Sequence, residues 1–477
     1  MSASWLARFR ETVAQESREI GLFAVLAAAL FLLLVSMASP PPPLNLLGVN
    51  MQFLLGMRFL NVAVFAGTVA LTYEFAHDLF QDRRISLTAA ALVVPTQLAN
   101  HAIIAWTHVP TTFLVLLTYF SYHRFRTRQD YRWLGVVAAA TGLVFGMRYS
   151  DIVILLPVGA HVLYDLYRGN LPGRPRSVLL PIVLGVITLV PVFAFHTAAF
   201  GSPLTTPYQV RPDALPPNDK TNLATEFNPV RTVLTVPAML FWFNPELPML
   251  NRDVQDFSWR YAKSALLQTS PFLVLAYFGL LRVWWRDDGF PGRTDLRLAS
   301  VGIFLLIMLY GSWIFFSGGW TTNMRYLTPI VPFLAVYTSY GIEPYLPRRR
   351  ELVRILLPAA GVAFLAGTGI ALSARRPVLL LNIVATAAAT ATFVAYLYAE
   401  EAGTGGSRQV LLASFGAAVG IGAVMVAVMD NLVQFWGDVG TVLLLHADTS
   451  LFLAAVLAAA TALFLVIAAR LWRDRNV

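Results

Sequence analysis

The chain has 477 residues, of which 57% are hydrophobic and 13% are charged, and its mean hydropathy is +0.63. Soluble domains carry roughly 25% charged residues, so this composition excludes a soluble globular protein and indicates a polytopic membrane protein. The formal net charge of +9 comes from short arginine clusters between apolar segments. Such clusters are typical of cytoplasmic loop anchors and speak against a nucleic-acid partner. The absence of cysteine excludes disulfides, thiolate metal sites and a cysteine nucleophile.

The amino terminus contains an amphipathic stretch ahead of the first long apolar run. Trp5 and Phe9 lie at helical spacing opposite Arg8 and Arg10, which predicts a cytoplasmic interfacial helix over residues 1–19. The apolar run at 20–38 has the length of a membrane span and exceeds the about 7 to 15 apolar residues of a signal peptide. We therefore expect this run to be the first span and to stay uncleaved.

Apolar windows of about 20 residues predict about fourteen membrane spans and an all-α polytopic membrane protein. We expect a transmembrane core over residues 20–346, which includes one long hydrophilic loop at 200–263, and a C-terminal transmembrane extension over 347–477. The extension is richer in Ala, Gly and Val than the core. The predicted spans lie near 20–38, 58–79, 85–101, 109–123, 133–149, 151–167, 178–199, 264–282, 298–317, 326–346, 352–372, 377–398, 409–429 and 450–470.

Arginines gather in alternate connections between the predicted spans, as in the segment from Arg124 to Arg132. Basic residues are retained in cytoplasmic loops, so we expect both termini in the cytoplasm and the 200–263 loop on the extracytoplasmic side of the cell membrane. Three arginines at the outer ends of predicted spans, Arg58, Arg148 and Arg325, are not explained by this rule. Charged groups at such depth are either functional or extend to the lipid headgroups, and the sequence leaves both interpretations open.

Three stretches resemble, in their order and sidedness, the GT-C superfamily of multi-spanning glycosyltransferases. The similarity is to members related to protein O-mannosyltransferases and to the aminoarabinose transferase of lipid A. This resemblance implies a GT-C-like fold and extracytoplasmic transfer of a sugar from a polyprenyl-phosphate donor held in the membrane lipid to an unknown acceptor. The three stretches are Arg58–Asp78 with the basic turn Gln81–Arg84 after it, Phe200–Tyr208 (FGSPLTTPY) and Gly318–Pro329 (GGWTTNMRYLTP).

The resemblance also implies a site for the donor phosphate on the outer face. An arginine at the membrane surface can hold a phosphate bidentately and stabilise the charge that develops as it departs. Arg325 is our first candidate for this role, followed by Arg148 and Arg58. Aromatic residues on the same face either stack against the sugar or form the interfacial belt of any membrane protein. The candidates for substrate contact are Tyr208, Trp320, Tyr326 and Asn323.

The first external loop departs from the superfamily pattern. Relatives typically carry an acidic residue there as general base or metal ligand, whereas Ser39–Met57 contains no Asp or Glu. Removal of a general base usually costs about 10²- to 10⁴-fold in rate. Either a substitute comes from elsewhere, or the loop is internally shortened, or the chain no longer catalyses. Each substitute also has a plainer interpretation: an ion pair with Arg148 for Asp151, interfacial hydrogen bonding for His108, and solvated loop charges for the two glutamates. The candidates are Asp151, Glu226, Glu246 and His108.

Two questions stay open at the level of sequence. A divalent cation needs two or three converging oxygen ligands, and no pair of residues has the spacing that indicates one, so no metal ligand is assigned and the cofactor is undetermined. The missing acid also leaves a non-catalytic GT-C-like scaffold or lipid-sugar-binding subunit as an alternative to an enzyme. A lipid or sugar transporter is a third hypothesis. Transporters commonly show repeats and broken mid-membrane helices, whereas here the polar features gather at the outer ends of the spans.

Overall fold

The computed structural model describes residues 45–46, 49–102, 107–169, 179–203, 229–241, 264–286, 289–312, 325–373 and 377–426. This part of the chain is helical except for β1 (Asn45–Leu46) and β2 (Val49–Asn50), which pair antiparallel with Asn45 opposite Asn50. The helices of the amino-terminal half are α2 (Met51–Phe80), α3 (Arg83–Val93), α4 (Gln97–Ala102), α5 (His108–Arg128), α6 (Tyr131–Met147), the 3₁₀ segment η1 (Tyr149–Leu155), α7 (Leu156–Arg168) and α8 (Leu179–Phe200).

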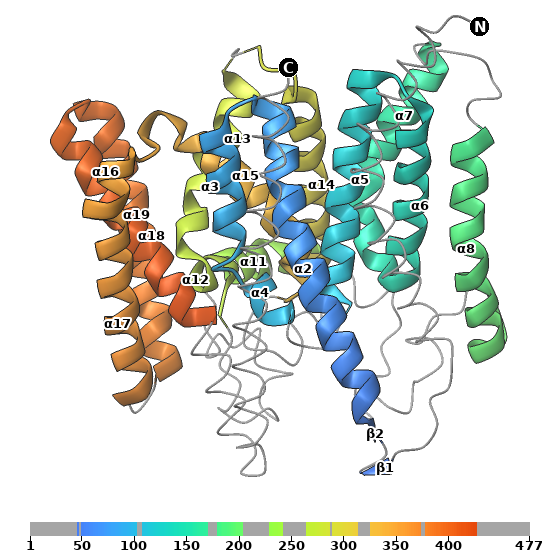
Figure 1. Cartoon of the computed structure of the whole chain (residues 1–477), viewed down its shortest axis with the longest axis horizontal. Coiled ribbons are helices and arrows are strands. Elements are labelled where there is room, and N and C mark those ends of the chain that lie inside the picture. Colours follow the sequence, from blue (N-terminus) through green and yellow to red (C-terminus); the bar gives the residue numbers. More distant parts are fainter. Residues whose placement is uncertain are drawn as a thin grey trace, which may run out of the picture.

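Most of the remaining long helices lie upright beside the first ones in the same bundle (Figure 1). The 3₁₀ segments η4 and η5 lead directly into α13 and α15, as η1 leads into α7, and η7 is a π-helical turn. In chain order the elements are α11 (Pro229–Leu240), α12 (Leu266–Thr269), η4 (Pro271–Leu275), α13 (Ala276–Trp285), α14 (Arg293–Ser312), η5 (Arg325–Ile330), α15 (Val331–Gly341), η6 (Glu343–Tyr345), α16 (Arg349–Glu351), η7 (Leu352–Leu356), α17 (Leu357–Ser373), α18 (Pro377–Ala402) and α19 (Gly405–Val424).

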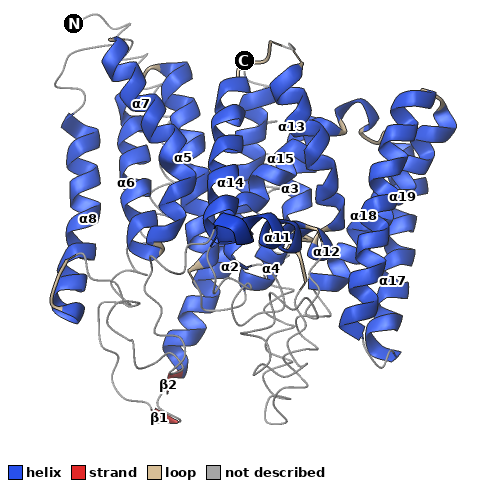
Figure 2. Ribbon diagram, turned by 180° about the vertical axis from the view of Figure 1, so that it is seen from behind, coloured by secondary structure: helices blue, strands red, loops and turns tan. Residues whose placement is uncertain are grey.

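The helices stand side by side in a broad bundle. Helices α2, α3, α5 and α13 to α15 occupy its middle, α8 lies at one edge, and α17 to α19 lie at the other (Figures 1 and 2). Seven described helices are long and apolar enough to cross a membrane, so the chain is an integral membrane protein. They are Phe59–Phe80, Tyr149–Arg168, Leu179–Ala198, Arg293–Ser312, Arg349–Ser373, Leu379–Ala402 and Gly405–Val424.

Several predicted segments differ from, or lie outside, this described part. The predicted spans 20–38 and 450–470 and the amino-terminal interfacial helix lie outside the described residues. Part of the 200–263 segment, predicted to be a loop, is helix α11. Its Ala238 and Met239 are buried. Its Val236 packs against Gly311 of α14, where an added Cβ would lie 2.6 Å from Val236 Cγ2. A helix this short is missed by windows of about 20 residues.

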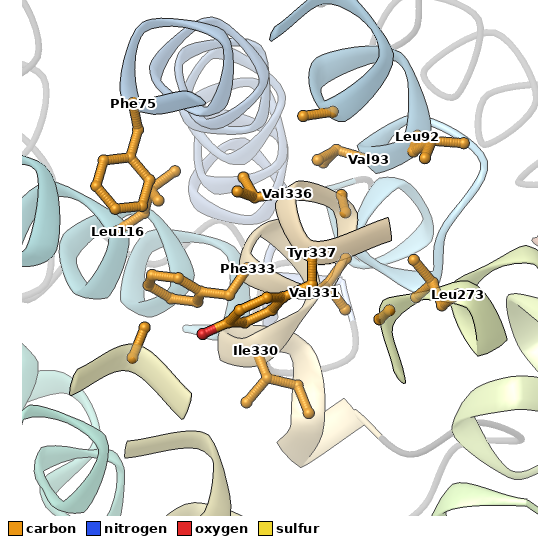
Figure 3. Close-up of a cluster of buried hydrophobic side chains, with 14 of the residues drawn as sticks. Phe75, Leu92, Val93, Leu116, Leu273, Ile330, Val331, Phe333, Val336 and Tyr337 are labelled. Carbon is orange, nitrogen blue, oxygen red and sulfur yellow. The ribbon is translucent and has the colours of Figure 1, made fainter. Parts of the chain in front are cut away.

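Helix α15 is the centre of the hydrophobic core (Figure 3). Its Phe333 ring meets Phe75 of α2 edge-on at a centroid distance of 6.2 Å, and Val336 of α15 is fully buried. Val93 of α3 and Leu116 of α5 are fully buried in the same cluster. Since these apolar side chains come from four helices, the core fixes the positions of α2, α3 and α5 around α15.

Helices α13 and α15 cross with their backbones in contact. A Cβ at Gly279 of α13 would lie 2.6 Å from the carbonyl carbon of Tyr337, and one at Gly341 of α15 would lie 2.8 Å from the backbone nitrogen of Gly279. Small residues at a crossing let two helices approach closely. The contact therefore depends on the absence of a side chain at both glycines.

Buried charges join α5 to its neighbours at the end of the bundle where α5 finishes. Asp295, near the start of α14, is 1% exposed; its carboxylate oxygens lie 2.8 Å from His123 Nδ1 and 2.9 Å from Arg126 Nη1. Arg124 pairs with Asp78 of α2. We call Asp78, His123, Arg124, Arg126 and Asp295 the α5 charge cluster. It lies among the arginines predicted to be cytoplasmic and holds α2, α5 and α14 together.

Replacing Asp295 with alanine should lower the free energy of unfolding by about 2–3 kcal/mol, because two hydrogen bonds to a charged group are lost. The cost stays below that of a fully isolated charge, since Arg126 keeps a 27% exposed side chain and can reach solvent. The measurement is thermal unfolding of the detergent-solubilised protein. Glu401→Ala, at an exposed position of α18, is the control and should leave the transition unchanged; equal stability of both variants would contradict the prediction.

Candidate functional site

The end of the bundle opposite the α5 charge cluster brings five polar segments together. His108 opens α5, Arg148 follows the last residue of α6, and Asp151 lies in η1. Tyr310 lies near the end of α14 and Tyr326 in η5. Because each of these elements begins or ends at this level, side chains far apart in the sequence meet here. We call these five residues the Arg148 cluster.

A break between α6 and α7 directs two of these side chains inward. Arg148 leaves the helical region with φ −155° and ψ 86°, and the chain continues as the 3₁₀ segment η1 before α7 begins with Pro157 near its first position. A 3₁₀ turn changes the angular spacing of its side chains relative to an α-helix. Arg148 and Asp151, three residues apart, therefore face each other across the break.

Arg148 is held on three sides. Its Nε lies 3.3 Å from Asp151 Oδ2, its Nη2 donates to Tyr310 Oη at 3.0 Å, and its Nη1 contacts His108 Nδ1. The guanidinium carbon lies 4.8 Å from the centroid of the Tyr326 ring, in a cation–π arrangement. The Arg148 side chain is 8% exposed, so most of its hydrogen-bonding capacity is used inside the protein.

Asp151 is fully buried and contacts the same partners. Its Oδ1 accepts from Tyr310 Oη at 2.5 Å, and Ser150 Oγ lies 2.9 Å from that hydroxyl. The plainer interpretation of Asp151, a local ion pair with Arg148, describes this arrangement. A general base has to come within hydrogen-bond reach of the acceptor, whereas the Asp151 oxygens face Arg148 and Tyr310. The geometry therefore favours a role for Asp151 in holding these two side chains.

Aromatic rings line the cluster. The His108 ring stands edge-on to Tyr326 at a centroid distance of 5.6 Å and lies 5.3 Å from His101 of α4. The rings of Tyr310 and Tyr326 lie 5.4 Å apart. His101 is fully buried and His108 is 6% exposed. Together with His101, the Arg148 cluster thus combines one guanidinium, one carboxylate, two imidazoles and two phenols at this end of the bundle.

The predicted site residues divide into two groups. The structure brings Arg148, Asp151, His108 and Tyr326 into contact. Arg58 lies within α2 and Arg325 opens η5 beside Tyr326, so their backbones are at this end of the bundle, while their side chains are outside the described part. The predicted residues that lie outside the described ranges altogether are Glu226, Glu246, Tyr208, Trp320 and Asn323.

Tyr310 and Ser150 are site residues that the sequence reasoning missed. Ser150 stands between two residues that were singled out, and Tyr310 is a hydroxyl-bearing residue at the outer end of the predicted span 298–317. An aromatic residue at that place resembles the interfacial belt. Within the described ranges, no three His, Asp or Glu side chains gather as a metal ion would require.

Comparison with known proteins finds a family model that matches part of the chain. Residues 44–195 match the sequence model of the family described as dolichyl-phosphate-mannose-protein mannosyltransferase. The predicted resemblance is confirmed for this segment. We call the matched residues 44–195 the mannosyltransferase-family segment. It contains His108, Arg148 and Asp151, which are three members of the Arg148 cluster.

Curated proteins and solved structures provide two further comparisons. No match to a curated protein was found. Among solved structures, the crystal structure of ArnT from Cupriavidus metallidurans bound to undecaprenyl phosphate aligns with 80% of this chain at 13% sequence identity and a TM-score of 0.40. The chain covers 64% of the length of that protein. The family match thus extends over residues 44–195 of the 477-residue chain.

Proposed function

We propose that the protein transfers a sugar from a polyprenyl-phosphate donor to an acceptor on the extracytoplasmic side of the membrane. The observation that carries this proposal is that the mannosyltransferase-family segment holds three residues of the Arg148 cluster. That family is named for a donor in which the sugar is attached to a lipid phosphate. A buried arginine at the end of the bundle opposite the arginine-rich loops fits a reaction at the outer membrane surface.

The proposal includes a topology and a division of the chain. The chain then has about fourteen spans, both termini in the cytoplasm and the 200–263 segment outside, with a transmembrane core at 20–346 and a C-terminal transmembrane extension at 347–477. The support is the separation of charge: the α5 charge cluster lies at one end of the described bundle and the Arg148 cluster at the other. Basic residues favour the cytoplasmic end, which puts the Arg148 cluster outside.

The contacts of Arg148 refine the proposed roles. Asp151 compensates its charge and the side chain is 8% exposed, so Arg325 stays our first candidate for binding the donor phosphate, with Arg58 as its partner. The general base comes from Glu226 or Glu246, because the Asp151 carboxylate is directed at Arg148 and Tyr310. The sugar is contacted by Tyr326 with Tyr208, Trp320 and Asn323.

Replacing Arg325 with alanine should reduce donor turnover about 10²- to 10³-fold, the usual cost of removing one donor that stabilises developing negative charge. The measurement is release of polyprenyl phosphate from a panel of polyprenyl-phosphate sugars by the purified full-length protein. Arg350→Ala, in α16 at the arginine-rich end, is the matched control and should keep turnover. Full activity of the Arg325 variant would contradict the phosphate role.

A non-catalytic lipid-sugar-binding subunit is the second candidate function. It is favoured by the acid-free segment Ser39–Met57 and by the internal contacts of Asp151. The same panel separates the two functions. Binding of a polyprenyl-phosphate sugar without release of polyprenyl phosphate supports the subunit, whereas release supports the enzyme, and the absence of both binding and release contradicts both candidates.

A further inference from the structure

The hydrogen-bonding capacities in the Arg148 cluster fix the direction of each bond. A guanidinium has five N–H donors and no acceptor, and it stays charged in proteins. Arg148 Nη1 contacts His108 Nδ1, so Nδ1 has to be the acceptor and has to lack a proton. A neutral imidazole with an unprotonated Nδ1 carries its proton on Nε2. His108 is therefore neutral, with Nε2–H as its donor.

The rest of the cluster keeps the guanidinium in this orientation. Tyr310 has one hydroxyl proton, which it gives to Asp151 Oδ1 at 2.5 Å, so its oxygen accepts from Arg148 Nη2 at 3.0 Å. The other Asp151 oxygen lies 3.3 Å from Arg148 Nε. With Nε and Nη2 engaged in this way, the planar guanidinium presents Nη1 to His108. Asp151 and Tyr310 act on His108 only through Arg148, which makes them positioning residues.

Within the described part of the chain, three other elements contribute the groups that contact His108 here. Arg148 follows α6, Tyr326 belongs to η5 and presents its ring edge-on at 5.6 Å, and His101 of α4 lies at 5.3 Å. The N–H of Arg148 Nη1 is directed at Nδ1, so this nitrogen has no place for a proton of its own. Tyr326 and His101 contribute ring packing at the distances given. The Arg148 contact is thus the one that decides the protonation of Nδ1.

We propose that Arg148 locks His108 as the neutral Nε2–H tautomer, which makes His108 a hydrogen-bond donor to an oxygen of the lipid-phosphate sugar and not the general base. The identity of that ligand rests on the proposed function, whereas the tautomer rests on the cluster alone. If His108 is a donor, the proton of the acceptor has to be taken by another group. This directs the search for the base to Glu226 and Glu246.

The tautomer is tested by nitrogen NMR of the full-length protein labelled with ¹⁵N-histidine, at neutral pH. His108 is identified by the signals lost in His108→Gln. We expect one unprotonated nitrogen, Nδ1, and one protonated nitrogen, Nε2. Arg148→Lys should introduce a second tautomer or a doubly protonated ring, because the fork that bridges three partners is lost. Tyr310→Phe should do the same, because Arg148 Nη2 loses the acceptor that keeps Nη1 directed at His108. A proton on Nδ1 in the unsubstituted protein overturns the proposal.

A second histidine provides the internal control. His161 of α7 contacts Tyr122 and lies 3.2 Å from Asp165 through the same nitrogen, Nδ1. The partners of this nitrogen are a carboxylate and a phenol outside the Arg148 cluster. The His161 signals should therefore not move in the Arg148 and Tyr310 variants. Changes at His161 equal to those at His108 would indicate a global disturbance and would overturn the assignment to Arg148, as would unchanged His108 signals in both variants.

The donor role is tested separately by turnover. His108→Ala should lose about 10²-fold in release of polyprenyl phosphate, the lower end of the cost of a missing donor. His108→Gln keeps an oxygen to accept from Arg148 and an N–H to donate, and it should lose about tenfold at most. Equal losses in both variants overturn the donor role. The NMR result does not depend on turnover, so failure of the proposed function is distinguishable from failure of this inference.

Discussion

Replacing Arg148 with alanine should lower the free energy of unfolding by about 3–5 kcal/mol, because it leaves a buried carboxylate without its counter-charge. Asp151 is fully buried, and the substitution would leave Tyr310 as its remaining donor among the contacts described above. The reciprocal change, Asp151→Ala, should have a similar cost because it isolates the guanidinium. The measurement is the unfolding transition of the purified protein in detergent, followed by tryptophan fluorescence.

A double variant distinguishes the pair from a simple loss of packing. Removing both charges, as in Arg148→Met with Asp151→Leu, should recover much of the stability, since a buried ion pair contributes little more than well-packed apolar residues of similar volume. Arg350→Ala, an exposed arginine of α16, serves as the control and should unfold like the unsubstituted protein. A double variant no more stable than either single variant would show that the pair is not the source of the effect.

Replacing Gly279 with alanine should cost about 3 kcal/mol or more, at or beyond the upper end of the usual range for overpacking. A Cβ there would lie 2.6 Å from the carbonyl carbon of Tyr337 and 2.9 Å from its Cα. These are backbone atoms of α15, which cannot rotate away as a side chain would. Helices α13 and α15 would have to separate, which disturbs the core around Phe333. The expected result is loss of monodisperse protein in size-exclusion chromatography and an earlier unfolding transition.

The matched control is another helical glycine with open space around it. A Cβ at Gly361 of α17 would meet nothing within 4 Å, and alanine is favoured over glycine in a helix by about 1 kcal/mol. Gly361→Ala should therefore leave the protein as stable as before or slightly more stable. If Gly279→Ala behaved like Gly361→Ala, the close backbone crossing would be refuted.

The sequence predicts the helical part of this fold well because membrane solvation acts locally. A run of apolar residues has to satisfy its own backbone hydrogen bonds in lipid, so its length alone indicates a helix. The predicted span 58–79 lies within α2, and 298–317 overlaps α14. Charge placement is equally local: the motif that contains Arg148 and Asp151 was visible as two charges at a span end. These charges do meet in the structure.

The sequence could not predict what these charges contact. The inward direction of Arg148 depends on the 3₁₀ segment η1, and its partner Tyr310 comes from α14, about 160 residues further along the chain. The same holds for His108, whose role as base or donor depends on which atom faces Nδ1. Helix α11 was missed for a different reason, since its stability comes from packing against Gly311 and not from its own length. Long-range contacts of this kind leave no local pattern.

The length of α2 has a consequence for depth in the membrane. The helix runs unbroken from Met51 to Phe80, and at about 1.5 Å per residue the rise from Arg58 to Phe80 is about 33 Å. This is close to the roughly 30 Å thickness of the hydrocarbon core. With Phe80 at one boundary of the hydrocarbon core, the Arg58 backbone would lie at the other, next to the headgroup region that holds the lipid phosphates. The two turns before Arg58 would then stand in the headgroup region, where a lipid-linked substrate has to approach sideways from the bilayer.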